Sequence, residues 1–226
     1  MAGGKTVVPH MTKEELREDP VLERIQKTIS FAERHSRWLI GGAVLVVAVI
    51  VGLSLLHRAQ VRGEREAARL LMDAQASFLQ NNLPAAESQF QQIIDSYGGT
   101  SAGVAARIYM GDVLRALDRP EEALRMYEQA AGKADDPLLE TGAARGRAAA
   151  YEDLGRFAEA SEAYERAAAS APFLQADDLV AAGRTALRAG DAARAKTILE
   201  QARDKVQGDR RSELALLLAK AEAATR

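Results

Sequence analysis

Hydrophobic and polar positions divide the chain into three parts. From Trp38 to Leu56 nineteen consecutive residues carry no charged side chain, whereas apolar and charged positions alternate on both sides of this stretch. At about 1.5 Å rise per residue a helix of this length covers about 28 Å, close to the ~30 Å hydrocarbon thickness of a bilayer. The pattern predicts one transmembrane helix at residues 38–56, between a tail at 1–37 and a larger domain at 57–226.

We expect the apolar segment to remain as an anchor, because a long tail precedes it and the following LLHRAQVRG has no small-x-small cleavage site. Basic residues near the two ends are equal in number, with four on each side, so this count does not decide the orientation. Short basic segments resist translocation, whereas long domains cross largely regardless of charge. The tail, with seven Lys and Arg, is therefore predicted to stay inside the cell and the domain to lie outside.

The tail is predicted to contain an amphipathic helix that leads into the membrane. Asp19 and Pro20 fit a helix start, and Leu22, Ile25 and Ile29 then recur at helical spacing. Such a stripe fits a helix docked on the membrane surface or on a partner membrane protein. It fits equally well a spacer whose apolar side simply meets lipid.

Residues 57–226 repeat one helical pattern four times. In each repeat a small anchor residue is followed four positions later by a large apolar one. The anchors lie 37, 37 and 35 residues apart and are Ala86, Ala123, Ala160 and Ala195. The large residues are Phe90, Tyr127, Tyr164 and Leu199, of which the three aromatic ones are expected to wedge between repeats. A partner helix precedes each anchor, so each repeat is predicted to be a helix pair.

Other positions in the repeats agree with helix pairs. Asn81, Gly155 and Gly190 stand where the turn within a pair requires a left-handed residue. Gly111 and Gly183 in the first helices are expected to face the anchor alanines. The C-terminal SELALLLAKAEAA, from Ser212, fits the capping helix that an open array requires. The predicted fold is all-α, a single transmembrane helix followed by an α-solenoid of about four helix pairs with a C-terminal cap.

These units resemble tetratricopeptide repeats, whose period is about 34 residues. The third unit shows the resemblance most clearly, in Tyr151, Gly155, Phe157, Ala160, Tyr164, Ala167 and Pro172. The consensus Trp of the first helix is replaced by Leu70, Arg107, Ala144 and Leu179. The layout of tail, span and repeats is similar to the YfgM-like ancillary subunits of the bacterial Sec translocon. This resemblance implies an inner-membrane protein with a periplasmic, chaperone-like repeat domain that handles newly exported proteins.

Tetratricopeptide arrays bind partners mostly along the concave face, which the first helix of each pair lines. The corresponding positions here predict a partner-binding groove of Leu71, Gln75, Phe78, Ile108, Asp112, Arg115, Arg145, Glu152, Asp153, Val180, Arg184, Leu187 and Arg188. A clamp for C-terminal carboxylates is excluded, because Leu71 and Gln75 stand where it needs Lys and Asn. Arg184 and Arg188 would suit an extended, partly apolar segment with acidic residues. The alternative is that these are ordinary solvated positions.

Composition narrows the chemistry further. The chain contains no cysteine, and its three histidines lie at 10, 35 and 57, which leaves little for a metal or nucleophile site. The chain has 30 basic and 32 acidic residues, of which seven basic and six acidic ones lie in the tail. The rest of the chain therefore carries 23 basic and 26 acidic residues. A domain with this slightly negative balance has no electrostatic footprint for nucleic acid.

No catalytic constellation emerges from the sequence. The adjacent pairs Asp135-Asp136 and Asp177-Asp178 are expected to be helix caps, and Gly98-Gly99 lacks the Lys-Ser/Thr of a phosphate loop. The prediction is a non-enzyme without cofactor, metal or small-molecule substrate, whose partners are other proteins and the lipid bilayer. It would hold exported clients or partner chaperones near a translocon. The alternatives are a structural accessory subunit of a larger inner-membrane complex, held by span and tail, and a cytoplasmic scaffold.

Overall fold

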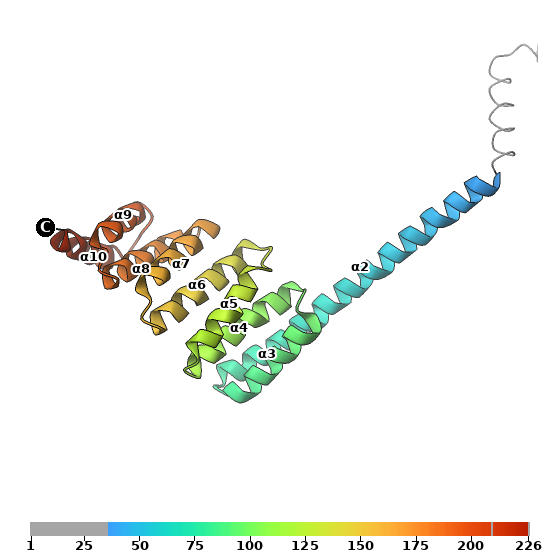
Figure 1. Ribbon diagram of the computed structural model, residues 1–226, viewed down its shortest axis with the longest axis horizontal. Helices are drawn as coiled ribbons and strands as arrows, with labels where there is room; N and C mark the ends of the chain where they lie inside the picture. The colour runs from blue at the N-terminus through green and yellow to red at the C-terminus, as the bar shows by residue number, and fades with distance from the viewer. Residues whose placement is uncertain (1–35, 209, 226) are drawn as a thin grey trace, which may run out of the picture. The chain divides into compact units, whose positions relative to one another are not determined.

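The computed structural model describes residues 36–208 and 210–225, and all regular elements in these residues are α-helices, as predicted (Figure 1). The tail residues Leu22, Ile25 and Ile29 lie outside the described residues. By their contacts the residues fall into two units, Met1–Ala59 and Gln60–Arg226. In chain order the helices are α2 (Ser36–Leu79), α3 (Leu83–Tyr97), α4 (Ser101–Ala116), α5 (Pro120–Ala131), α6 (Pro137–Asp153), α7 (Phe157–Ser170), α8 (Gln175–Arg188), α9 (Ala192–Ala202) and α10 (Arg210–Ala224).

The described part of the first unit is the N-terminal portion of α2. The large apolar side chains of this portion are exposed, among them Trp38 at 83% and Leu45 and Leu56 at 66% each. Within the described residues α2 is the one helix whose length and composition would allow it to cross a membrane. Within the described residues these side chains form an exposed apolar surface, which is larger than a soluble domain usually shows.

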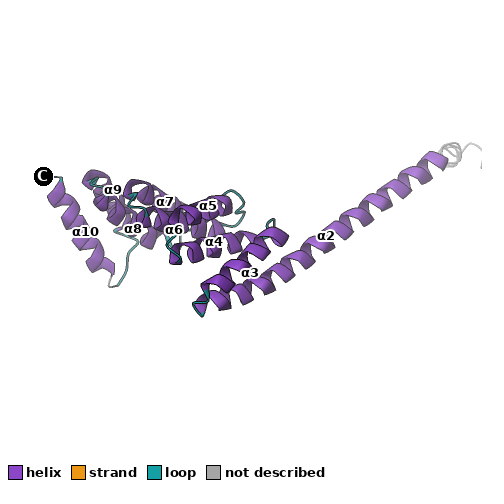
Figure 2. Cartoon of the chain, turned by 60° about the horizontal axis from the view of Figure 1, so that its bottom comes forward, coloured by secondary structure: helices purple, strands orange, loops and turns teal. Residues whose placement is uncertain are grey.

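The second unit is a stack of helix pairs that ends in a single helix. The part of α2 from Gln60 onward pairs with α3, and the next pairs are α4 with α5, α6 with α7, and α8 with α9. The second helix of each pair also packs on the first helix of the next pair, and α10 covers α9. Short loops connect the helices of this unit (Figure 2). The predicted solenoid of four pairs and a C-terminal cap is confirmed, although the cap begins at Arg210 rather than at Ser212.

The four turns within the pairs share one geometry. Asn81, Gly155 and Gly190 have φ values of 59°, 71° and 84°, which confirms the left-handed residues predicted there. Asp118, at φ 57°, takes this role in the second pair, where the sequence shows no glycine or asparagine. In all four turns the amide of the following residue donates to a carbonyl of the last helical turn at 2.8–3.0 Å. The shared turn returns each second helix antiparallel to its first.

The core is built from small anchors and large wedges. All four predicted anchors are fully buried, namely Ala86, Ala123, Ala160 and Ala195. The fully buried Tyr127 lies between Gly111 of its own pair and Gly146 of the next, and a Cβ placed at Gly111 would come within 2.5 Å of the ring. The atoms nearest to Gly183 belong to Leu199. Gly111 and Gly183 thus make room for large side chains of the second helices, which lie nearest to them.

Candidate partner-binding groove

The predicted groove contains one pocket to which three repeats contribute. Phe78 from α2, Asp112 and Arg115 from α4, and Asp153 from the end of α6 line a space of about 590 Å³. The turn residue Asp118 and the first residue of α5, Pro120, also line it and were not predicted. Their signal in the sequence was weak, because Asp118 lies in the turn after α4 and Pro120 starts a second helix, whereas the groove was mapped onto the first helices.

Other predicted groove residues are partly or fully committed to packing. Leu71 and Ile108 are half-buried and contact the core cluster of the first two repeats. Leu187 packs on the last core cluster. Val180 has only 2% of its surface exposed, so its assignment to the groove is wrong. Gln75 is half-buried. The apolar part of the accessible groove therefore lies mainly around Phe78.

Ion pairs run between the first helices of successive repeats. Arg115 donates through Nε to Asp153 Oδ2 at 2.6 Å, and Arg188 donates through Nη1 to Glu152 at 2.8 Å. The guanidinium of Arg188 also lies 3.9 Å from the centre of the Phe157 ring. These pairs are partly exposed, so each adds at most about 1 kcal/mol to stability. Their larger effect is electrostatic, because they neutralise charged side chains that were predicted to contact a partner.

The two remaining predicted arginines are also paired within the chain. Arg184 lies 3.5 Å from Glu213 of the capping helix, and Arg145 donates to the buried carboxylate of Asp178. Burial raises the pKa of Asp178, while the hydrogen bond from Arg145 opposes this and the neighbouring Asp177 adds to it. Arg184 and Arg188, on which the predicted preference for acidic segments rests, thus each lie beside a carboxylate of the chain.

Two tyrosines of the second helices, the buried Tyr127 and the half-buried Tyr164, hold groove carboxylates in place. Tyr127 donates its hydroxyl proton to Asp112 Oδ1 at 2.6 Å, and Tyr164 donates to Glu152 Oε1 at 3.0 Å. Burial, together with the adjacent carboxylates, raises the pKa of Tyr127 and raises that of Tyr164 to about 12. Burial also raises the pKa of Asp112, against the hydrogen bond from Tyr127 and the charge of Arg115. Both hydroxyls therefore stay protonated and act as fixed donors behind the groove.

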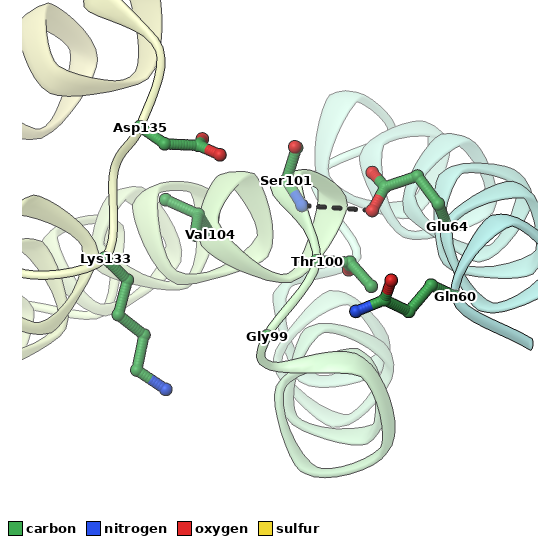
Figure 3. Close-up of a pocket in the computed structure, with 8 residues that line it drawn as sticks. All are labelled: Gln60, Glu64, Gly99, Thr100, Ser101, Val104, Lys133 and Asp135. Atoms are coloured by element: carbon green, nitrogen blue, oxygen red, sulfur yellow. Dashed lines mark hydrogen bonds between the residues drawn. The ribbon is translucent and has the colours of Figure 1, made fainter. Parts of the chain in front are cut away.

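A second, smaller cleft of about 240 Å³ lies at the start of α4 (Figure 3). Its lining residues are Gln60, Glu64, Gly99, Thr100, Ser101, Val104, Lys133 and Asp135. The carboxylate of Glu64 accepts the backbone N–H groups of Ser101 and Ala102 at 3.2 and 3.1 Å. Because the carboxylate of Glu64 binds these N–H groups at the electropositive start of α4, Glu64 acts as a cap of this helix.

The acidic pairs singled out in the sequence have different roles. Asp136 is the N-cap of α6 and accepts the N–H of Leu138 at 2.6 Å, as expected. Asp177 and Asp178 lie inside the first turn of α8, where they pair with arginines, so their assignment as caps is wrong. In the described part of the chain no three His, Cys, Asp or Glu side chains come together in a way that could hold a metal ion.

Comparisons with known proteins agree with this architecture. A tetratricopeptide repeat family profile matches residues 146–173, which cover the end of α6, all of α7 and the first residues after it. No curated protein matches the sequence. The solved structure of kinesin light chain TPR-like repeats from Podosopora anserina superposes with a TM-score of 0.58 at 18% identity, over 72% of this chain and 87% of that one.

Two further solved structures show the same arrangement. A tetratricopeptide repeat protein of Parabacteroides merdae has a TM-score of 0.58 at 16% identity, over 70% of this chain and 61% of its own. Yeast Tom70 has a TM-score of 0.54 at 18% identity, over 70% of this chain and 33% of its own. The repeat domain thus has the fold of a tetratricopeptide solenoid, an architecture whose curvature creates an extended concave surface.

Proposed function

We propose that this is a single-pass membrane protein, anchored by residues 38–56, whose repeat domain at 57–226 binds other polypeptides outside the cytoplasm near a site of protein translocation. The observation that carries the proposal is the apolar part of α2, whose large side chains no described residue covers, in one chain with an interaction solenoid. A bilayer would supply the apolar environment that these side chains lack in water. Partner polypeptides would lie along the groove around Phe78.

A second candidate function is that of a structural accessory subunit in a larger inner-membrane complex, held by the span between Trp38 and Leu56 and by the tail. The ion pairs of Arg145, Arg184 and Arg188 favour it, because a groove whose charges are satisfied within the chain offers less to a client. In this function the repeats would act as a rigid bracket, and the residues Leu22, Ile25 and Ile29 would carry the contact.

In-cell photocrosslinking separates the two functions. Photoreactive residues at Phe78 and Arg184 report on the groove, and the same residues at Ile25 and Ile29 report on the tail. We expect the groove positions to trap many exported proteins or a chaperone, which supports the client-binding function. If only the tail positions trap, and always the same membrane subunit, the protein is a structural accessory and the groove proposal is refuted.

The orientation can be tested because the chain has no cysteine of its own. A single cysteine is introduced at the exposed Asp204 in the repeat domain, and in a second variant at Thr6 in the tail. With the domain outside, a membrane-impermeant maleimide labels Asp204→Cys in intact cells and labels Thr6→Cys only after lysis. The reverse pattern would place the repeats in the cytoplasm and leave the cytoplasmic scaffold as the function.

A further inference from the structure

The pocket around Phe78 differs in charge from the other end of the groove. Three carboxylates line it, those of Asp112, Asp118 and Asp153, against a single basic residue, Arg115. Arg115 is taken up by its 2.6 Å ion pair with Asp153. The surplus negative charge therefore falls on Asp112 and Asp118. At the far end, by contrast, Arg184 and Arg188 each have a carboxylate partner.

Asp112 presents a fixed hydrogen-bond acceptor to this pocket. Its Oδ1 accepts the hydroxyl proton of the fully buried Tyr127, which holds the carboxylate in one orientation. Among the described residues no side chain or backbone group donates to its Oδ2. A carboxylate held by one oxygen, with the other oxygen available, is preorganised to accept a donor from a ligand.

The rest of the lining describes the shape of the ligand. Phe78, Ala116 and Pro120 contribute apolar surface beside the carboxylates. A bare metal ion does not fit, because no group of three suitable ligands converges in the described part of the chain. A cation for this pocket has to bring its own hydrogen donors and an apolar stem. Lysine and arginine side chains combine these two features, and an aromatic ring such as that of Phe78 favours a cation near its face.

We propose that this pocket receives a lysine or arginine side chain of an extended partner segment, with the cationic head at Asp112 and the aliphatic stem along Phe78. The proposal rests on the proposed function, because it names the chemistry that the groove would select in its polypeptide partners. It replaces the acidic segment expected from the sequence with a basic one. Two observations favour a basic segment. The pocket around Phe78 carries surplus negative charge, and the arginines at the far end of the groove already have carboxylate partners.

The test measures peptide binding by the full-length protein in detergent micelles. The probes are fluorescein-labelled ten-residue peptide pools in which a central residue is fixed as Lys, Arg, Gln or Glu and the flanking positions are randomised. We expect the Lys and Arg pools to bind about ten-fold more tightly than the Glu pool, as read by fluorescence anisotropy. Asp112→Asn, which keeps the shape and the acceptor for Tyr127, is expected to lower affinity for the Lys pool about five-fold, a typical loss for one charge-assisted hydrogen bond in a partly exposed site.

Two further variants complete the design. Asp204→Asn removes the same charge from an exposed position outside the groove and is expected to leave all affinities unchanged. Phe78→Leu keeps an apolar wall without the ring. It is expected to lower the affinity for the Lys and Arg pools about two-fold more than the affinity for the Gln pool. Circular dichroism of each variant confirms that the helices remain folded.

The outcomes separate this inference from the function on which it rests. Saturable binding without preference for Lys or Arg, or an Asp112→Asn variant that retains the preference, overturns the basic pocket while the groove remains a peptide-binding surface. An Asp204→Asn variant that loses as much affinity as Asp112→Asn shows a general charge effect and overturns the pocket as well. Absence of binding by every pool overturns both the pocket and the proposed client-binding groove.

Discussion

The packing of Tyr127 between two repeats makes a sharp prediction for Gly146→Ala. A Cβ at Gly146 would lie well inside van der Waals distance of the Tyr127 ring. The ring is confined further, because Gly111 also lies against it and its hydroxyl is bound to Asp112. Gly142 on the same helix provides a matched control, since a Cβ there would meet only the end of the Ile108 side chain, at 3.4 Å.

The two substitutions are expected to change the free energy of unfolding in opposite directions. In a helix interior alanine is favoured over glycine by about 1 kcal/mol, and Gly142→Ala should realise most of this gain. Overpacking a tight core costs about 1–3 kcal/mol, and the rigid surroundings of Tyr127 place Gly146→Ala at the upper end. Because the alanine also gains about 1 kcal/mol of helix propensity, Gly146→Ala should lower the free energy of unfolding by about 2 kcal/mol in total. The two variants should thus differ by about 3 kcal/mol, or about 6–12 °C in Tm.

The assay is thermal and urea unfolding of the full-length variants in detergent, followed by circular dichroism at the helix band. A second arm repeats Gly146→Ala in a Tyr127→Leu background, where the smaller side chain leaves room for the new methyl group. There the cost of Gly146→Ala should fall by at least about 1 kcal/mol. If Gly146→Ala is as stable as Gly142→Ala, or costs the same with and without Tyr127, the inter-repeat wedge described here is refuted.

Three further predictions concern a cap, a turn and a buried acid. Glu64→Gln should lower the free energy of unfolding by about 1 kcal/mol in urea denaturation, because the charge at the start of α4 is lost; an unchanged midpoint would contradict this cap. Gly190→Ala, at φ 84°, should cost about 1–2 kcal/mol in the same assay, whereas Asn81→Gly should be close to neutral; equal losses would argue against the left-handed turns. For Asp178 the raised pKa means that the folded state holds its proton to higher pH than the unfolded state, so its contribution to stability falls as pH rises through that pKa. As pH rises above about 4, the ordinary value of an aspartate, the wild type should therefore lose stability relative to Asp178→Asn in thermal unfolding, and parallel curves would refute the assignment.

Regular, local features of this protein could be predicted from the sequence. The anchor alanines repeat at a nearly constant interval, and the interval alone indicates stacked helix pairs. Asn81, Gly155 and Gly190 were recognisable because a left-handed backbone is a property of one residue in one turn. The apolar stretch from Trp38 was recognisable because an uninterrupted run of apolar residues needs no knowledge of tertiary contacts.

The charge pattern of the groove depended on tertiary contacts. Arg115 pairs with a residue 38 positions away and Arg188 with one 36 positions away, and the helical period does not say which side chains of neighbouring repeats reach each other. Arg107, which stands at the consensus Trp position, is buried with only 5% exposed, and its guanidinium donates to the carbonyls of Gly98 and Gly103.

Sequence alone therefore established the stack of helix pairs, the turns within them and an apolar segment long enough to cross a bilayer, because each follows from spacing or from the backbone preference of a single residue. The tertiary structure decided which charges in the groove are neutralised and that the residues around Phe78 form one pocket. These properties arise only when side chains from different repeats meet, at distances and angles that a one-dimensional pattern does not contain.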